Sequence, residues 1–344
     1  MDYRSFLFLI VLLMICDTKP LNADGESNLL PPNTEAQTNV AINLFISDIL
    51  SIDEKEETFE VDGFLSAEWV DSRLAFDQEE FGYPWKTYRN EMVTKKLEED
   101  IWWPDLYLVY SKGNRRIINS FIEVYPDGLV HYEERFEATI KQPFFLEGFP
   151  FDSHVLDLTI STFSYTDYEV VFSSEYELEP FEWETNEWII TDTGTLTAET
   201  RNGYPYATYT IGISRLPWFY VSKFVLPLVL IITISWAVFW MDYASVSIAD
   251  RVEISLTSVL TVVAFDFVSS EFLPKLSYFT TLDLIMIISY VILSLTILET
   301  LLCYIFTKRG AQIKAQRIDL LSRIAFPAVY YISIISVIFS RLLL

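Results

Sequence analysis

The stretch "ADRVEISLTSVLTVVAFDFVSSEFLPK", residues 249–275, decides the fold of this 344-residue chain. Its middle is apolar enough to cross a membrane, yet Glu253 and Asp266 lie inside the apolar run, where an unpaired charge is costly. On a helix with 3.6 residues per turn, a stripe at intervals of four and three residues continues from Glu253. Its members are Thr257, Leu260, Ala264, Phe267 and Glu271, with Asp250 near its edge at the inner end.

This stripe predicts a water-filled pore. Rings of carboxylates select cations, and an apolar ring between them gates by dewetting. Because one helix cannot enclose a pore, several copies must assemble around an axis. The alternative is a helix with two stray acids at its interfaces, which suits Glu271 and fits Glu253 less well, because Val252 and Ile254 flank Glu253. Asp266 lies about 220° from Glu253 on the same wheel and needs a partner inside the protein; Lys223 is expected, with Asp283 sharing the site.

Apolar segments on both sides complete a membrane domain over residues 217–344. Each of four segments is near the roughly 20 residues that a bilayer requires. The expected spans are 217–241, 248–270, 280–306 and 320–342. The connection "TKRGAQIKAQRIDL" is rich in Lys and Arg and should therefore be cytoplasmic. Counting spans from this loop places both residue 217 and the C-terminus outside the cytoplasm.

Residues 24–216 predict an antiparallel β-sandwich. In "FEVDGFLSAEWV" (59–70), apolar and polar residues alternate with the period of a half-buried strand. Phe64 breaks the pattern by lying on the polar face. "YPDG" (125–128) predicts a turn before the strand "LVHYEERF", and many such short runs are typical of a sandwich. Residues 34–50 fit either a helix or a strand.

The N-terminus and the charge distribution indicate where this domain lies. Residues 1–23 have the basic start and apolar run of a secretory signal. The chain carries 48 acids against 24 bases, and all of the excess lies in residues 24–216. Such a surface repels nucleic acid and attracts cations. We therefore expect a multi-pass protein of the cell (plasma or inner) membrane with its β-domain outside.

Four short motifs add a resemblance to a known family. They are "WWPD" (102–105), "FPFD" (149–152), "RLP" (215–217) and "LPK" (273–275). In this order and spacing, the chain resembles the pentameric ligand-gated ion channels, the Cys-loop receptor superfamily. It departs from animal members where two cysteines flank the "FPFD" loop, because Gln142 and Leu156 stand there. The absent disulfide, the short cytoplasmic loop and the lack of an N-x-S/T sequon resemble bacterial members.

The resemblance implies a homopentamer with Glu253 as a carboxylate ring and Leu260 as the gate. Anion-selective relatives carry Pro-Ala before the basic residue, where this chain has Asp250 in "IADR". Cation selectivity, with monovalent cations permeating, is therefore expected. Agonists of the family bind between subunits in an aromatic cage. The positions that match this cage are Phe64, Phe163, Tyr204, Tyr206, Tyr110 and either Tyr132 or Glu133.

The resemblance also implies a coupling region between the two domains. Asp152 and Arg215 match an ion pair that Glu54 joins, while Phe151 and Pro274 lie in loops at the boundary. The agonist remains open between an amine, an aromatic acid and protons. An anion channel and a membrane-anchored binding or sensor protein are the alternatives. The sequence contains no metal-ligand cluster, nucleophile motif or phosphate loop, so neither an enzyme nor a cofactor is expected.

Overall fold

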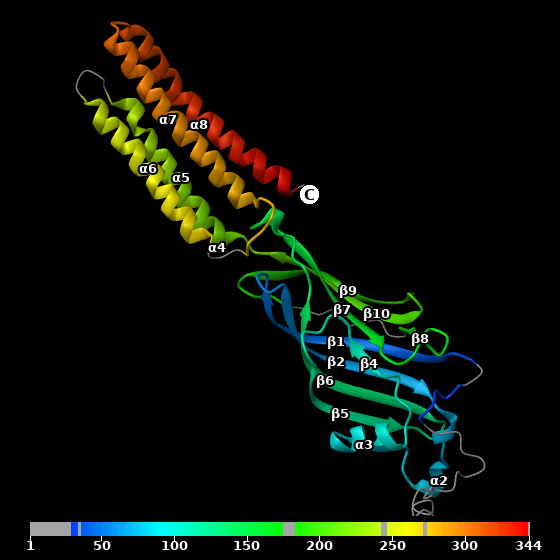
Figure 1. Cartoon of the computed structure of the whole chain (residues 1–344). Helices are drawn as coiled ribbons and strands as arrows, with labels where there is room; N and C mark the ends of the chain where they lie inside the picture. Colours follow the sequence, from blue (N-terminus) through cyan, green and yellow to red (C-terminus); the bar gives the residue numbers. More distant parts are fainter. Residues whose placement is uncertain (1–28, 34–35, 175–182, 242–245, 271–273, 343–344) are drawn as a thin grey trace, which may run out of the picture.

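The protein has a β-rich half and a helical half that lie end to end (Figure 1). This computed structural model describes residues 29–33, 36–174, 183–241, 246–270 and 274–342. The predicted signal, residues 1–23, lies outside them. Strand β10 ends at Arg215 and helix α4 begins at Trp218, so the chain changes from strand to helix within two residues.

In the described part of the chain, ten strands form two sheets. The six-stranded sheet has the order β3-β5-β6-β2-β1-β8, and the four-stranded sheet has the order β4-β7-β10-β9. The strands are β1 (Thr38–Asp53), β2 (Thr58–Val70), β3 (Lys86–Arg89), β4 (Leu106–Leu108), β5 (Arg116–Val124), β6 (Leu129–Lys141), β7 (Ser153–Thr162), β8 (Val170–Ser173), β9 (Trp188–Arg201) and β10 (Tyr204–Arg215). Short helical segments are η1 (Ser72–Leu74), α2 (Gln78–Phe81), α3 (Glu91–Glu99) and η2 (Leu146–Gly148).

The predicted sandwich is confirmed, and alternation places its core between the sheets. On β2, every second residue from Phe59 to Trp69 is buried, including Gly63, which lies against β1, while Phe64 on the other face is half-buried. Asp62 departs from the pattern, because it is buried on the polar face and paired with Arg135. A Cβ on Gly63 would approach the Phe45 carbonyl oxygen to 2.8 Å, so only glycine fits there. The "YPDG" turn joins β5 to β6 as predicted, with Gly128 at φ +87°.

Two features differ from the simplest sequence expectation. The described part of the ambiguous segment 34–50 is a strand from Thr38 onward, within β1, since its alternating apolar residues pack inward. The sandwich is not wholly antiparallel, because β1 pairs in parallel with β8 from Thr38 to Ala41. This pairing covers the edge of the six-stranded sheet with a short strand, as natural sheets commonly do.

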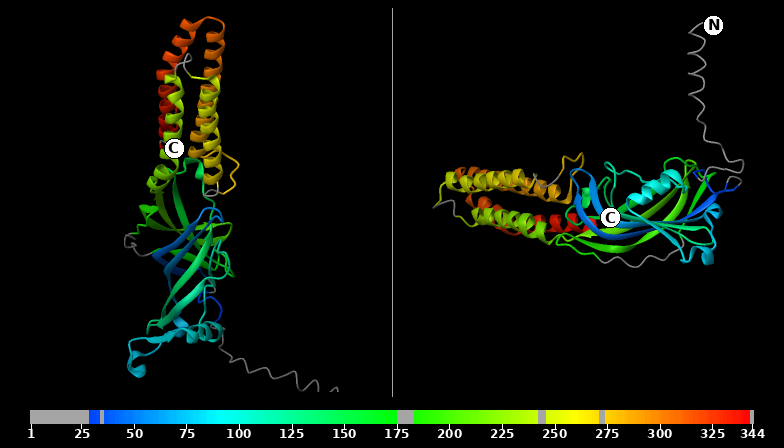
Figure 2. Two further views of the ribbon diagram at one scale, coloured as in Figure 1. Left: turned by 90° about the vertical axis from the view of Figure 1, so that its left-hand side faces the viewer. Right: turned by 90° about the horizontal axis from the view of Figure 1, so that it is seen from below.

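The helical half contains long helices packed side by side (Figure 2). Its segments are α4 (Trp218–Tyr220), η3 (Val221–Val225), α5 (Leu226–Ser235), η4 (Trp236–Trp240), α6 (Ile248–Ser269), α7 (Thr281–Lys308) and α8 (Gln312–Leu342). The first four run on continuously, and α8 begins before the expected start near residue 320. The bundle interior contains Leu228, Ile232 and Trp236 from the first helix, together with Val262, Ile285 and Tyr330.

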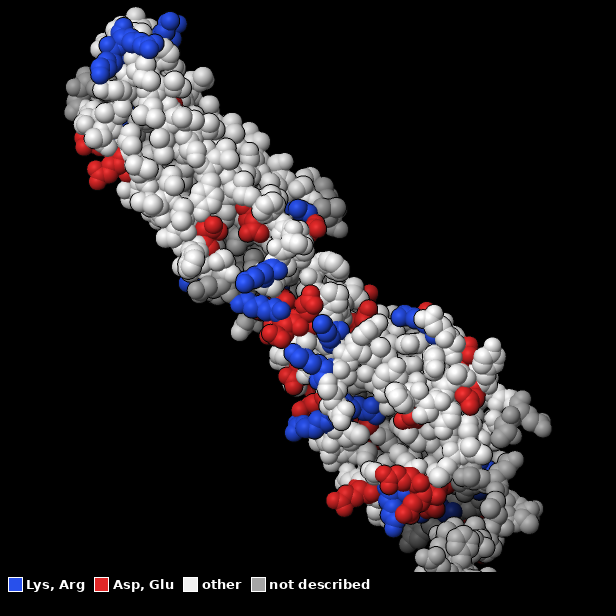
Figure 3. Space-filling model, viewed as in Figure 1, with Lys and Arg blue, Asp and Glu red and all other residues white. Residues whose placement is uncertain are grey.

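Within the described part of the chain, three helices are long and apolar enough to cross a membrane. They span Trp218–Trp240, Thr281–Lys308 and Gln312–Arg341. Helix α6 is not among them, and it carries the charged residues noted above. On the face drawn in Figure 3, charged side chains are sparse over the helical half, and Lys and Arg gather at its far tip. There Lys308, Arg309, Lys314 and Arg317 are exposed.

Candidate functional site

A group of aromatic side chains gathers on the four-stranded sheet. The register pairs Ser161 of β7 with Tyr107 of β4 on one side and with Tyr206 of β10 on the other. The Phe163 ring lies 6.1 Å from that of Tyr107, nearly perpendicular to it, and is 75% exposed. Tyr204, at the start of β10, is also exposed. The structure thus brings Phe163, Tyr204 and Tyr206 to one edge of the sheet.

Backbone contacts hold this edge together. Asp105, the last residue of "WWPD", has φ +53° and accepts a hydrogen bond from the Phe163 N–H at 3.0 Å. The Asp167 N–H donates to the Gly203 carbonyl at the tip of the β9–β10 hairpin, 2.9 Å away. The loop that carries Phe163 is therefore attached both to β4 and to the hairpin that carries Tyr204.

A cleft of about 730 Å³ lies on the same sheet, beside the aromatic group. Tyr110, which is 74% exposed, borders it together with Asp157, Arg201 and Thr208. Burial raises the pKa of the Asp157 carboxyl, and the charge of Arg201 opposes this shift. The cleft therefore combines an aromatic border with one acid, Asp157, and two cationic side chains, Arg201 and Lys141, and its volume suits a small organic ligand.

Phe64 lies on the other sheet and cannot complete the cage within one chain. It pairs with Phe45 of β1 and Arg135 of β6 in the six-stranded sheet. The Arg135 guanidinium lies 5.8 Å from the Phe64 ring centre and is ion-paired with Asp62 at 2.8 Å. A cage that uses both Phe64 and Phe163 requires two subunits.

The structure corrects the prediction that Tyr132 lines the aromatic cage. Its side chain is 3% exposed and packs against Trp103, with ring centres 4.4 Å apart. Its hydroxyl donates to Glu134, which is itself paired with Arg115 at 2.6 Å. Burial raises the pKa of the Tyr132 hydroxyl, and the neighbouring Glu134 raises it further. Tyr132 belongs to the core of the sandwich, so it does not face a neighbouring subunit.

At the boundary between the halves, Arg215 is the centre of an ion-pair cluster. Its side chain is 1% exposed and pairs with Asp152 at 2.9 Å, with Glu54 at 2.6 Å and with Glu187. The guanidinium also lies 4.0 Å from the Trp188 ring centre. The predicted contact of Arg215 with Asp152 and Glu54 is present. Every carboxylate of the cluster comes from a different segment of the β-domain.

His154 contacts the same Asp152 oxygen, Oδ2, that Arg215 Nη2 reaches. Its Nε2 lies 2.7 Å from an Asp152 oxygen, and its ring packs against Phe144 and Trp188. Burial alone would raise the pKa of the Asp152 carboxyl, but the hydrogen bond to His154 and the charge of Arg215 outweigh it. The pKa of Asp152 is therefore held below its usual range.

The loop between β6 and β7 touches the helices directly. The Leu146 N–H donates to the Tyr278 hydroxyl at 3.0 Å, and the Thr281 hydroxyl donates to the Glu147 carbonyl at 3.2 Å. Arg341, near the end of α8, pairs with Glu147 at 3.0 Å. Phe151 in this loop and Pro274 before α7 are both half-buried. The C-terminal end of α8 therefore lies at the same end of the bundle as the β-domain (Figure 1).

Gln142 closes this loop at one of the two positions where the resemblance implies a cysteine in animal members. Its side-chain amide donates to the Val155 carbonyl, and its Oε1 accepts from the Asp157 N–H at 2.9 Å. These two contacts flank Leu156, the other matching position. Of the phenylalanines in this loop, Phe144 and Phe149 are buried and Phe151 is half-buried, whereas Phe145 is 72% exposed.

Helix α6 presents the predicted stripe away from its own bundle. Within the described residues, every member is exposed, with Leu260 at 67% and Phe267 at 76%. The members are Asp250, Glu253, Thr257, Leu260, Ala264 and Phe267; Glu271 lies outside the described residues. The opposite face is buried at Arg251, Ser255, Ser258 and Val262, which follow the same four-three spacing.

Asp266 lies off the stripe, as predicted, but its hydrogen-bond partner among the described side chains is Tyr290 and not the predicted Lys223. Its Oδ2 accepts a hydrogen bond from the Tyr290 hydroxyl of α7 at 3.1 Å. Asp283 does not share this site, because its carboxylate caps α7 through the backbone N–H and hydroxyl of Thr280, both 2.8 Å away. The expected pairing with Lys223 is replaced by a contact with a residue that a helical wheel of α6 cannot reveal.

Sequence reasoning missed two further groups. Tyr107 shares the aromatic edge, and its position between buried Leu106 and Leu108 was the available signal. Arg251 is fully buried and donates to the Met241 carbonyl at 2.9 Å and to Asp319 at 3.3 Å. The contact with Asp319 depends on how α6 and α8 meet in space, which no local pattern encodes.

Comparisons with known proteins identify the class that this fold and these sites define. A family described as the neurotransmitter-gated ion-channel ligand binding domain matches residues 21–217, and one described as the neurotransmitter-gated ion-channel transmembrane region matches residues 224–314. The chain belongs to this family, the pentameric ligand-gated ion channels of the Cys-loop superfamily. Its members are channels with an extracellular ligand-binding domain, and they are not enzymes.

Individual relatives come from distant organisms. The chain is 28% identical over 320 residues to a proton-gated ion channel of Gloeobacter violaceus, which covers 90% of this chain and 85% of that protein. It is 26% identical over 303 residues to the gamma-aminobutyric acid receptor subunit alpha-2 of Rattus norvegicus and over 302 residues to that of Homo sapiens. The chain spans only 64% of the length of these receptor subunits.

Proposed function

We propose that the chain is the subunit of a homopentameric, cation-selective channel of the cell membrane. Four helices cross the bilayer, α6 lines the pore, and the β-domain and the C-terminus lie outside. The observation that carries this proposal is the division of α6 into a packed face and an exposed stripe. The basic far tip of the bundle supports a cytoplasmic position for the α7–α8 turn.

The acidic residues of the stripe favour selectivity for cations over anions. In a pentamer, Asp250 and Glu253 form two adjacent rings of carboxylates at the inner mouth. Leu260 then forms an apolar ring about two turns further along. An anion channel remains the second candidate, because one set of relatives is named as gamma-aminobutyric acid receptor subunits.

Leu260→Thr tests the pore and its gate. A hydroxyl wets the apolar ring, so we expect cation current through reconstituted pentamers without any agonist. Leu295→Thr, at an exposed position of α7, is the matched control and should leave the closed state intact. The current should reverse near the Na⁺ potential in a NaCl gradient. Reversal near the Cl⁻ potential would overturn cation selectivity, and silence of Leu260→Thr would favour the membrane-anchored sensor.

The agonist site is proposed between subunits, with Phe163, Tyr204, Tyr206 and Tyr110 from one chain and Phe64 from the next. Protons or a small molecule open the channel there. Phe163→Ala should raise the half-maximal concentration of a small agonist about tenfold, as loss of one cation–π contact of roughly 1–2 kcal/mol implies. Tyr132→Phe, a change in the core, should leave this concentration unaltered. Equal effects of the two variants would contradict the assignment.

A further inference from the structure

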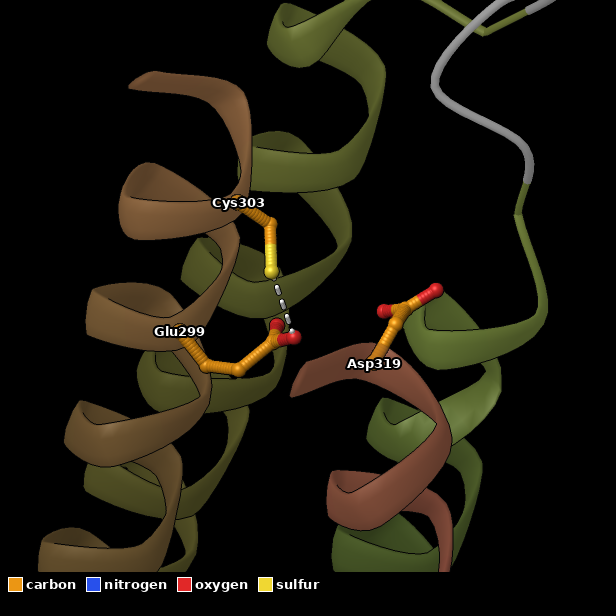
Figure 4. Close-up of side chains that lie close together, drawn as sticks. All are labelled: Glu299, Cys303 and Asp319. Atoms are coloured by element: carbon orange, nitrogen blue, oxygen red, sulfur yellow. Dashed lines mark hydrogen bonds between the residues drawn. The ribbon is translucent and has the colours of Figure 1, made fainter. Parts of the chain in front are cut away.

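A compact group of metal-ligating side chains lies inside the far end of the helical bundle. Glu299 and Cys303 are one turn apart on α7, and Asp319 lies opposite them on α8 (Figure 4). One ligand atom from each lies within 4.8 Å of the other two, and all three residues are buried. The Cys303 thiol donates to Glu299 Oε1 at 3.2 Å.

A second observation points to a missing ligand. Glu299 is 5% exposed, and its Oε2 is buried without a hydrogen-bond partner. Figure 4 shows its carboxylate directed into the space between α7 and α8. Burying an unsatisfied carboxylate oxygen is costly, so such groups normally gain a partner.

The neighbouring charges leave room for a cation. Fully buried Arg251 contacts Asp319 at 3.3 Å, and Arg323, one-third exposed, reaches the other Asp319 oxygen at 3.7 Å from the rim. Both arginines contact Asp319. Among the buried groups, two carboxylates face one guanidinium, which leaves one negative charge. A divalent cation that replaces the thiol proton of Cys303 brings this sum to zero.

We propose that Glu299, Cys303 and Asp319 form a binding site for a divalent cation of the Zn²⁺ class. A thiolate with two carboxylates suits a borderline-soft ion, with Zn–S near 2.3 Å and Zn–O of about 2.0–2.2 Å. Tetrahedral geometry then requires a small inward movement of the ligand atoms from their present spacing, and a water takes the fourth position. Binding releases the Cys303 proton and changes no oxidation state.

Such an ion would join α7 to α8 directly beside the Arg251 contact of α6. Three helices would then be connected at the end of the bundle opposite the β-domain. This proposal does not depend on the ion selectivity or the agonist of the channel, because the cluster lies within one subunit.

Co²⁺ binding to the purified full-length chain tests the site. The sequence contains two cysteines, Cys16 and Cys303, so a Cys16→Ser background leaves one thiol. After treatment with a chelator, titration with Co²⁺ should produce thiolate-to-metal charge-transfer absorption at one ion per chain, and Zn²⁺ should abolish it. Absence of this absorption overturns the proposal.

Glu299→Gln is the decisive variant, because it keeps both the thiol and the Asp319–Arg251 contact. It should weaken Co²⁺ binding at least tenfold while the protein elutes as the same oligomer in size-exclusion chromatography. Glu147→Gln, which removes an exposed carboxylate at the opposite end of the bundle, should leave the titration unchanged. Unaltered Co²⁺ affinity in Glu299→Gln would show binding by a lone thiol and would also overturn the site.

Discussion

Two buried arginines lie at opposite ends of the helical half, and their guanidinium groups have different sets of partners. Arg215, at the end next to the β-domain, has three carboxylate partners and an indole ring within 4.0 Å. Arg251, at the far end, contacts one carboxylate and one carbonyl. Glu299 lies close by with an unsatisfied oxygen.

The difference shows what a buried charge needs. A guanidinium has five donors in a fixed fork, and burial is tolerated when good acceptors surround it. The Arg215 cluster meets this demand with residues from separate loops, so it ties those loops together. The Arg251 cluster instead contains a buried carboxylate oxygen, Glu299 Oε2, without a hydrogen-bond partner, and this oxygen is the basis of the proposed metal site.

Arg215→Glu should have the largest effect of all the variants. It places a fourth carboxylate among three, and breaking a buried pair costs about 3–5 kcal/mol. We expect a fall of roughly 10 °C in the thermal midpoint and loss of gating in channels that still reach the surface. Arg341→Glu, which disrupts an exposed pair, should cost at most about 1 kcal/mol. Normal currents from surface-expressed Arg215→Glu would contradict the coupling role.

Asp319→Asn should have the next largest effect. It removes the carboxylate that Arg251 contacts, at a cost of about 3 kcal/mol, and the Met241 carbonyl limits the loss. This cost is measured as a fall in the thermal midpoint of the chelator-treated pentamer. Size-exclusion chromatography after heating determines the midpoint. An unchanged midpoint would show that Arg251 does not rely on Asp319.

His154→Phe should have a smaller effect that grows in acid. Because the folded pKa of Asp152 lies below its unfolded value of about 3.9, its contribution is complete above that pH. The contribution disappears as pH falls through the folded pKa. Removing the hydrogen bond from His154 raises that pKa, so acid unfolding should begin at higher pH, with a loss of about 1–2 kcal/mol at neutral pH.

Fluorescence of Trp188, which contacts the His154 ring, reports this acid unfolding. His131→Phe is the control, because His131 pairs with the more exposed Glu68 away from the boundary. An equal shift of the acid midpoint in both variants would rule out a specific role for His154.

Glu299→Gln should have the smallest effect on stability without metal. It removes a buried charge that lacks a full set of partners. We therefore expect the free energy of unfolding to change by no more than about 0.5 kcal/mol. The chelator-treated protein is the sample for this measurement. A loss as large as that of Asp319→Asn would mean that Glu299 is the true counter-ion of Arg251.

Local patterns predicted most of the fold. The two-residue period of β2 and the four-three spacing of α6 both encode which face is buried, and the structure agrees at the described positions except Asp62, which is buried on the polar face of β2. The same period would have placed Tyr132 inside, because Val130, Tyr132, Glu134 and Phe136 alternate on β6. Carrying the residue over from relatives overrode that signal, and buried Glu134 obscured it.

Contacts between distant segments could not be predicted. Tyr290 as the partner of Asp266, and Asp319 as that of Arg251, depend on how whole helices pack. A wheel of one helix shows that a charge points inward but not which side chain meets it. The ion pair of Asp152 with Arg215 was predicted only because the resemblance supplied the pairing.

The two hydrogen bonds of the Gln142 side chain have a consequence for how this protein is produced. Two hydrogen bonds from one amide close the boundary loop, and residues 24–216 contain no cysteine. Folding of the β-domain therefore requires no oxidant and no disulfide isomerase, and reducing agents cannot open the loop. Heterologous production is thus independent of the redox state of the host compartment.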